Sequence, residues 1–213
     1  LLFGFGVAII AGFLLTAVQT WTGRPGVSGA PLALLAGLWL AARLGWLVNL
    51  PWPLLAVLEL SFPLAVAGVM GWTLWTVRQT RNYPIVLVLG LLAVADALAL
   101  YGVLRQDEGT QRQAVLTGLW LVAAMMGLIG GRVIPFFTQR GLGRVDGVKP
   151  WPWLDRVLLG GSILIALLYA SGLAVFPSGW SGALFAALGL GHLLRLVRWH
   201  DRGLWRVPLL WSL

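Results

Sequence analysis

The chain contains no cysteine and few charged residues, and both shortages narrow what it can be. Without cysteine among its 213 residues, this chain forms no disulfide, no thiolate metal site and no haem–thiolate bond of its own. Charged residues make up only 10% of the sequence, whereas a soluble domain carries about a quarter. No polar stretch is long enough to form a separate soluble domain. We therefore expect a protein that has the lipid bilayer as its solvent.

Long apolar segments fill the chain, and hydrophobic residues account for 59% of it. A membrane span needs about 20 predominantly apolar residues. Such segments lie at 2–20, 31–49, 52–77, 83–104, 114–136, 154–176 and 180–199, and an eighth begins at 207–213. The sequence predicts an all-α, polytopic transmembrane helical bundle that forms one domain over residues 1–213. Because both ends lie within apolar segments, we expect the chain to be part of a longer protein of roughly twelve spans.

Basic residues divide the connections between spans into two sides. One side carries Arg24, Arg78, Arg81, Arg140, Arg144, Lys149, Arg195, Arg198, Arg202 and Arg206, and the other carries Arg105 and Arg112. Since cytoplasmic loops are enriched in Lys and Arg, this contrast places loops 21–30, 78–82, 137–153 and 195–206 in the cytoplasm and residue 1 outside. The net charge of +8 therefore indicates topology and contact with lipid headgroups, not nucleic acid.

Most of the 13 Trp residues fall near predicted span ends, where amphipathic rings favour the headgroup level. Trp39 and Trp120 lie deeper, and each is expected to need a partner for its indole N–H. Small residues spaced by four, such as Gly4, Ala8 and Gly12, predict close helix approach.

Arg43 and Glu59 are predicted to meet inside the membrane. Each lies eight residues from Pro51, at the turn of a helical hairpin, so both should sit about 12 Å below the interface at 1.5 Å per residue. Equal depth on antiparallel neighbours favours an ion pair. The pair either handles a proton or ion or clamps a carboxylate, or it is a structural bridge that fixes helix register.

Asp96 and His192 are further ionisable residues within apolar segments. Asp96 has no basic neighbour in sequence, so it is either a protonated structural acid or part of a proton relay. The neutral imidazole of His192 suits haem iron or copper, or a hydrogen bond across a helix interface. His200 is expected in a solvated loop, and Met125 and Met126 are expected to pack.

Glycines, Arg132 and Pro135 gather where the fifth span ends, in the segment Gly130-Gly-Arg-Val-Ile-Pro-Phe-Phe-Thr138. Arg132 either extends to lipid phosphates or makes forked hydrogen bonds to a carboxylate such as a haem propionate. Pro135 is expected to bend its helix. The sequence has no pair of histidines at helical spacing, so any metal site would need ligands from helices outside this chain.

Three stretches of the chain resemble the NnrS family of bacterial membrane proteins. The first runs from Leu2-Phe-Gly-Phe to Trp21-Thr-Gly23, and the second and most specific is Gly130 to Thr138. The third runs from Leu193 to Trp199 and continues with Trp205 and Pro208-Leu-Leu-Trp211. Their order and spacing extend the resemblance over the whole chain.

The resemblance implies a multi-pass protein of the bacterial inner membrane that binds haem and copper and protects against nitric oxide. His192 is then the implied cofactor and metal ligand, and Arg132 or Arg43 neutralises haem propionates. Positions implied to line a pocket or to cap helices are Trp21, Thr22, Gly131, Pro135 and Thr138. Further ligands would come from a histidine-containing stretch that the family has upstream of Leu2. The implied partners are the bilayer, the remaining helices of the same protein, and nitric oxide or a related small ligand.

Two other functions stay open. In an ion- or proton-coupled transporter or channel, Asp96 and the Arg43–Glu59 pair would line a polar path. In a structural subunit, the same residues would only hold partner chains. Reduction, binding and sensing of nitric oxide are all compatible with the sequence pattern.

Overall fold

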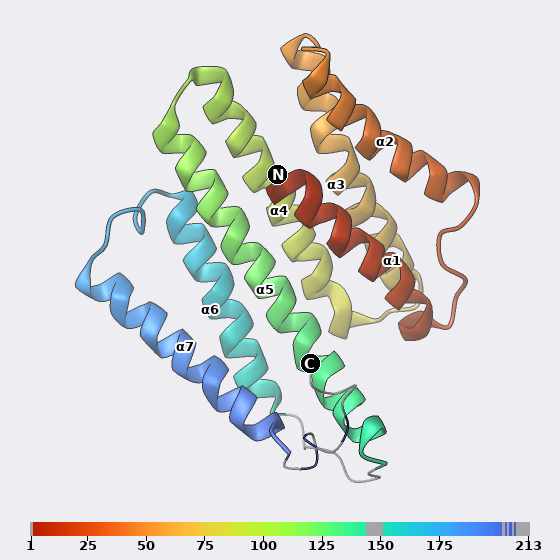
Figure 1. The fold of residues 1–213 in the computed structure, drawn as a ribbon, viewed down its shortest axis with the longest axis vertical. Coiled ribbons are helices and arrows are strands. Elements are labelled where there is room, and N and C mark those ends of the chain that lie inside the picture. Colours follow the sequence, from red (N-terminus) through yellow and green to blue (C-terminus); the bar gives the residue numbers. More distant parts are fainter. Residues whose placement is uncertain (1, 144–150, 202, 204, 206, 208–213) are drawn as a thin grey trace. The chain divides into compact units, whose positions relative to one another are not determined.

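A computed structural model describes residues 2–143, 151–201, 203, 205 and 207 of the chain (Figure 1). Within these residues it has no strands, and seven helical segments are long and apolar enough to cross a membrane. A π-helical turn η1 (Leu2–Gly6) leads into α1 (Val7–Thr22), which α2 (Ala30–Leu47) and α3 (Trp52–Thr76) follow. A short 3-10 turn η2 (Thr80–Asn82) then precedes α4 (Tyr83–Arg105), α5 (Glu108–Gly141), α6 (Pro152–Ala170) and α7 (Gly179–Trp199). The predicted all-α membrane bundle with seven full spans is confirmed.

Several predicted boundaries are wrong by a few residues. The fifth helix extends the predicted 114–136 at both ends, because the polar residues after Asp107 form its first turns. The sixth ends at Ala170 and not at 176, where Gly172 turns the chain with a φ of 82°. The predicted loops 137–153 and 195–206 begin with residues that are still helical. The predicted eighth span, at 208–213, lies outside the described residues.

The helix ends follow local chemistry. Proline occupies the first turn of α2, α3, α4 and α6, where its missing N–H has no intrahelical partner to lose. A capping box begins α7: the Ser181 N–H donates to Ser178 Oγ (3.3 Å), and the Ser178 N–H donates to Ser181 Oγ (3.1 Å). Two prolines that the sequence predicted to bend their helices, Pro63 and Pro135, lie inside α3 and α5.

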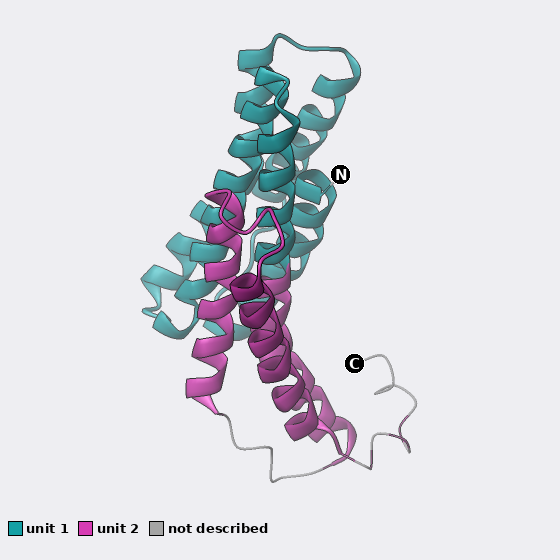
Figure 2. Ribbon diagram, turned by 90° about the vertical axis from the view of Figure 1, so that its left-hand side faces the viewer, with its two compact units in different colours: residues 1–122 teal, residues 123–213 magenta. Residues whose placement is uncertain are grey.

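The chain divides into two compact units, residues 1–122 and 123–213 (Figure 2). In the first unit α3 packs against α1, α2 and α4, around fully buried side chains that include Leu14, Met70 and Leu89. In the second unit α6 packs against α7. Each unit contains one cluster of charged side chains.

Large apolar side chains remain on the outside of both units. Leu47 is 76% exposed, Trp72 73% and Phe176 77%. In water such surfaces would be a liability, whereas in a bilayer they contact lipid chains. Aromatic pairs also lie at helix ends, with ring centroids 6.2 Å apart for Trp46 and Trp52, as expected for interface anchors.

Candidate functional site

Arg43 of α2 and Glu59 of α3 form an ion pair in the first unit. The hairpin geometry predicted this contact, and it is confirmed. The Glu59 side chain is only 6% exposed, so the guanidinium provides the charge that offsets the buried carboxylate. The pair therefore joins two neighbouring helices within the apolar part of the fold.

Gly4 makes room for this ion pair. A Cβ at Gly4 would overlap the Arg43 guanidinium, so a residue with a side chain could not occupy this position without moving Arg43. The Trp39 Nε1–H, one turn before Arg43 on α2, donates to the Gly4 carbonyl (2.8 Å). The deep indole thus has the partner that its position requires, and the predicted close helix approach has a polar purpose at Gly4.

Asp96 of α4 belongs to the same region of the first unit. It is 6% exposed, and electrostatic interactions reach it from both Glu59 and Arg43. Among the described residues, the Arg43 Nε atom is buried without a hydrogen-bond partner. The cluster thus holds one guanidinium and two carboxyl groups, so it lacks one positive charge when both acids are ionised.

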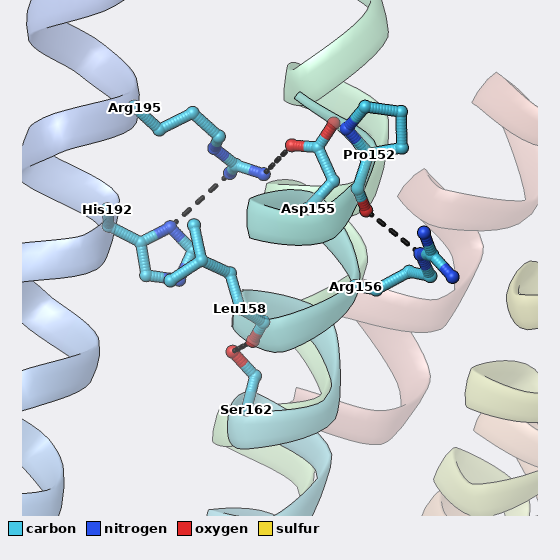
Figure 3. Close-up of polar contacts among 7 residues, drawn as sticks. All are labelled: Pro152, Asp155, Arg156, Leu158, Ser162, His192 and Arg195. Atoms are coloured by element: carbon cyan, nitrogen blue, oxygen red, sulfur yellow. Dashed lines mark hydrogen bonds and ion pairs between the residues drawn. The ribbon is translucent and has the colours of Figure 1, made fainter. Parts of the chain in front are cut away.

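A second cluster centres on Arg195 of α7 (Figure 3). The Arg195 side chain is 10% exposed, and its Nη1 donates to Asp155 Oδ1 of α6 at 3.3 Å. Its Nη2 lies 3.3 Å from His192 Nδ1, one turn earlier on α7. The guanidinium also lies over the Trp199 ring, 4.8 Å from the centroid. Figure 3 shows Arg156 pointing away from this cluster, where its Nε donates to the Pro152 carbonyl at 3.1 Å.

Two glycines of α5 face this cluster, and we call Gly127 and Gly131 the glycine face. A Cβ at Gly127 would lie 3.3 Å from both Arg195 Nη2 and His192 Cε1, and one at Gly131 would lie 3.3 Å from Arg195 Nη1. Small residues one turn apart let helices approach closely in a membrane. The glycine face therefore makes space for the guanidinium and the imidazole.

Arg195 and Asp155 were not among the predicted site residues, since Arg195 was assigned to a cytoplasmic loop. That assignment is wrong: α7 continues to Trp199, and Arg195 is buried. The spacing of three between His192 and Arg195 could have revealed the contact, because residues three apart share a helix face. The partner Asp155 has no comparable signal in the sequence.

The other predicted positions have separate local settings. Thr22 closes α1: its hydroxyl donates to the Val18 carbonyl (2.7 Å) and accepts from the Arg24 N–H (3.3 Å), which matches the predicted role in a helix cap. The carbonyl of Trp21 accepts a hydrogen bond from Gln79 Nε2. Arg132 is half-buried on α5. Thr138 is buried, and its hydroxyl has no hydrogen-bond partner among the described residues.

The remaining histidine and the two methionines behave as structural residues. His200 is exposed directly after α7, Met125 is fully buried, and Met126 is 68% exposed on the apolar outside. Within the part of the chain that the structure describes, no group of three His, Asp or Glu side chains could hold a metal ion. His192 does not fit iron as it stands, because its Nδ1 already faces the guanidinium of Arg195.

Comparison with known protein families gives one match, to the NnrS protein family, over residues 1–213. The chain therefore belongs to the NnrS family, as the sequence motifs suggested. No curated protein and no solved structure matches it.

Proposed function

We propose that this member of the NnrS family is a bacterial inner-membrane protein that protects against nitric oxide and binds haem, with copper as a second metal. The family match over residues 1–213 is the observation that carries the proposal. The seven apolar helices supply the multi-pass membrane part. Bound haem would supply an iron centre with affinity for nitric oxide.

The iron ligands in this proposal lie outside the described residues. No described group of three ligand side chains could hold a metal, and His192 Nδ1 is engaged by Arg195. We assign no chemical step to the iron for this reason. The described residues would contribute to binding of the haem periphery and to the rigidity of the surrounding helices.

Arg132 is the residue that we propose for contact with a haem propionate. It lies half-buried on α5, one residue after Gly131 of the glycine face, and a guanidinium can bind a carboxylate through two parallel hydrogen bonds. Arg43 is less suited to this role, because Glu59 already occupies its guanidinium. A propionate at Arg43 would leave the buried Glu59 without its partner.

An absorption spectrum and metal analysis of the intact purified protein test the proposal. We expect a Soret band that shifts when nitric oxide is added, and a lower haem content in Arg132→Gln than in the wild type. Arg140→Gln, at an exposed position further along α5, is the matched control and should keep the wild-type haem content. A colourless, metal-free protein that still protects cells from nitric oxide would overturn the proposal.

Proton or ion transfer is the second candidate function, and the charge cluster in the first unit favours it. Two buried carboxyl groups and one guanidinium on α2, α3 and α4 are an arrangement that can exchange a proton or a cation. In proteoliposomes, Asp96→Asn should abolish flux, whereas Asp107→Asn, in the exposed connection before α5, should not. Absence of flux in the wild type would eliminate this function.

A further inference from the structure

The contact between Arg195 and His192 determines which ring nitrogen of His192 carries a proton. A guanidinium has only N–H donors and no acceptor. With Arg195 Nη2 at 3.3 Å from His192 Nδ1, the nitrogen of the ring must be the acceptor. The lone pair of Nδ1 is therefore in use, and Nδ1 carries no hydrogen.

A neutral imidazole with an unprotonated Nδ1 carries its proton on Nε2. A metal bound to Nε2 needs the lone pair that this proton occupies. Histidines that ligate metals through Nε2 usually donate their Nδ1–H to a carboxylate, a carbonyl or water. Arg195 provides the reverse arrangement, with a donor where an acceptor is required.

The surroundings hold Arg195 in this position. Asp155 accepts from the other terminal nitrogen of the guanidinium, and the Trp199 ring lies against its face. Rotation of the His192 ring by half a turn would place a C–H group opposite Arg195 and would lose the hydrogen bond. The Cε1 edge of the ring packs towards Gly127, so the ring is also confined by the glycine face.

We infer that His192 is a hydrogen-bond donor through Nε2 that serves an acceptor oxygen, such as a carboxylate, and that Arg195 is the positioning residue that fixes this tautomer. His192 is accordingly not a ligand of iron or copper. The inference rests on the contacts of α5, α6 and α7 within the second unit. It does not depend on the proposed function.

Nitrogen NMR of protein labelled with 15N-histidine tests the tautomer directly. Because the chain has two histidines, the variant His200→Gln leaves only the signals of His192. We expect a neutral ring with hydrogen on Nε2 and none on Nδ1. A ring with hydrogen on Nδ1, or on both nitrogens, at neutral pH would overturn the inference.

Substitution of Arg195 tests its positioning role. Arg195→Met removes the donor and should allow a population with hydrogen on Nδ1, whereas Arg156→Met, on the exposed side of α6, should leave the tautomer unchanged. An unchanged tautomer in a folded Arg195→Met variant would contradict the assigned role. If Arg195→Met does not fold, the signals of His192 in His200→Gln still decide the main inference.

Metal content provides an independent test. His192→Gln retains an acceptor and a donor in the side chain, and we expect it to bind haem and copper to the same extent as the wild type. A loss of either metal in the folded variant would overturn the inference. A wild type that binds no haem would count against the proposed function alone, because the tautomer would still be observable.

Discussion

Gly4 shows how a single residue without a side chain can determine the position of a buried charge. The guanidinium of Arg43 occupies the place where a Cβ at residue 4 would lie, and Glu59 holds the guanidinium there. An arginine side chain is flexible and could usually move aside at little cost. Here any movement would weaken an ion pair that is largely removed from water.

Gly4→Ala should therefore destabilise the protein by about 1–3 kcal/mol, the usual cost of overfilling a packed site. Gly12→Ala, eight residues further on, is the control because nothing lies within 4 Å of an added Cβ there. Thermal unfolding in detergent should show a lower Tm for Gly4→Ala only. In a Glu59→Gln background the cost of Gly4→Ala should shrink, and an equal cost in both backgrounds would contradict the explanation.

Asp107 predicts a pH dependence at the connection between α4 and α5. The hydroxyl of Thr110 donates to Asp107 Oδ2 (2.6 Å), and the N–H groups of Thr110 and Gly109 donate to Oδ1. These hydrogen bonds hold the pKa of Asp107 below its usual value of 3.8. Since the folded pKa is depressed, the stabilisation is fully present above the ordinary value and is lost as the pH falls through the folded one.

Thermal unfolding at neutral and acidic pH measures this effect. Asp107→Asn should lower Tm at neutral pH, and its deficit should disappear in acid. Glu108→Gln, at the neighbouring exposed residue, should retain the acid-dependent loss of the wild type. A constant difference between Asp107→Asn and the wild type at all pH values would contradict the assignment.

The sequence predicted individual residues well where hairpin geometry constrained them. Arg43 and Glu59 lie at equal distances from a turn, so their pairing followed from helix rise alone. Arg195 and Asp155 are on helices joined by a connection without such symmetry, and helix rotation decides whether they meet. A rotation cannot be read from apolar segments that lack a polar face.

Helices depend on the same constraint at the scale of elements. The α5 and α7 helices approach each other because the glycine face accommodates Arg195 and His192. The sequence predicted the existence of these helices from the length of their apolar segments. Their ends were harder to predict, since the polar first turns of α5 and the basic last turn of α7 resemble loops in composition.

Gly131→Ala should weaken the packing of α5 against α7. An added Cβ would lie 3.3 Å from Arg195 Nη1, whereas at Gly130 the nearest atom is the flexible Ile134 Cδ1 at 3.6 Å. Relative to Gly130→Ala, we expect Gly131→Ala to be less stable by about 1 kcal/mol. Both substitutions gain the same helix propensity, so a comparison of their unfolding free energies isolates the contact. Equal stability of the two variants would mean that Arg195 is not held tightly.

The absence of cysteine makes the topology of the whole molecule testable. Asn49 lies in the connection between α2 and α3, and Ser28 lies in the connection between α1 and α2. If the basic side is cytoplasmic, a membrane-impermeant maleimide should label Asn49→Cys in cells with a permeable outer membrane. Ser28→Cys should react only after the inner membrane is opened. The unsubstituted chain has no thiol to react, and the reverse labelling pattern would invert the topology.

The burial of Arg195 also has a consequence for biosynthesis. Of the seven spans, α7 has the lowest mean hydropathy, and an arginine near the centre of a span costs about 2.5–3.5 kcal/mol on insertion. The glycine face and Asp155 precede Arg195 in the chain, so the ribosome delivers them to the membrane first. When α7 leaves the translocon, a counter-charge and a space for its guanidinium are already in place, and α7 enters the bilayer as a partner of earlier helices.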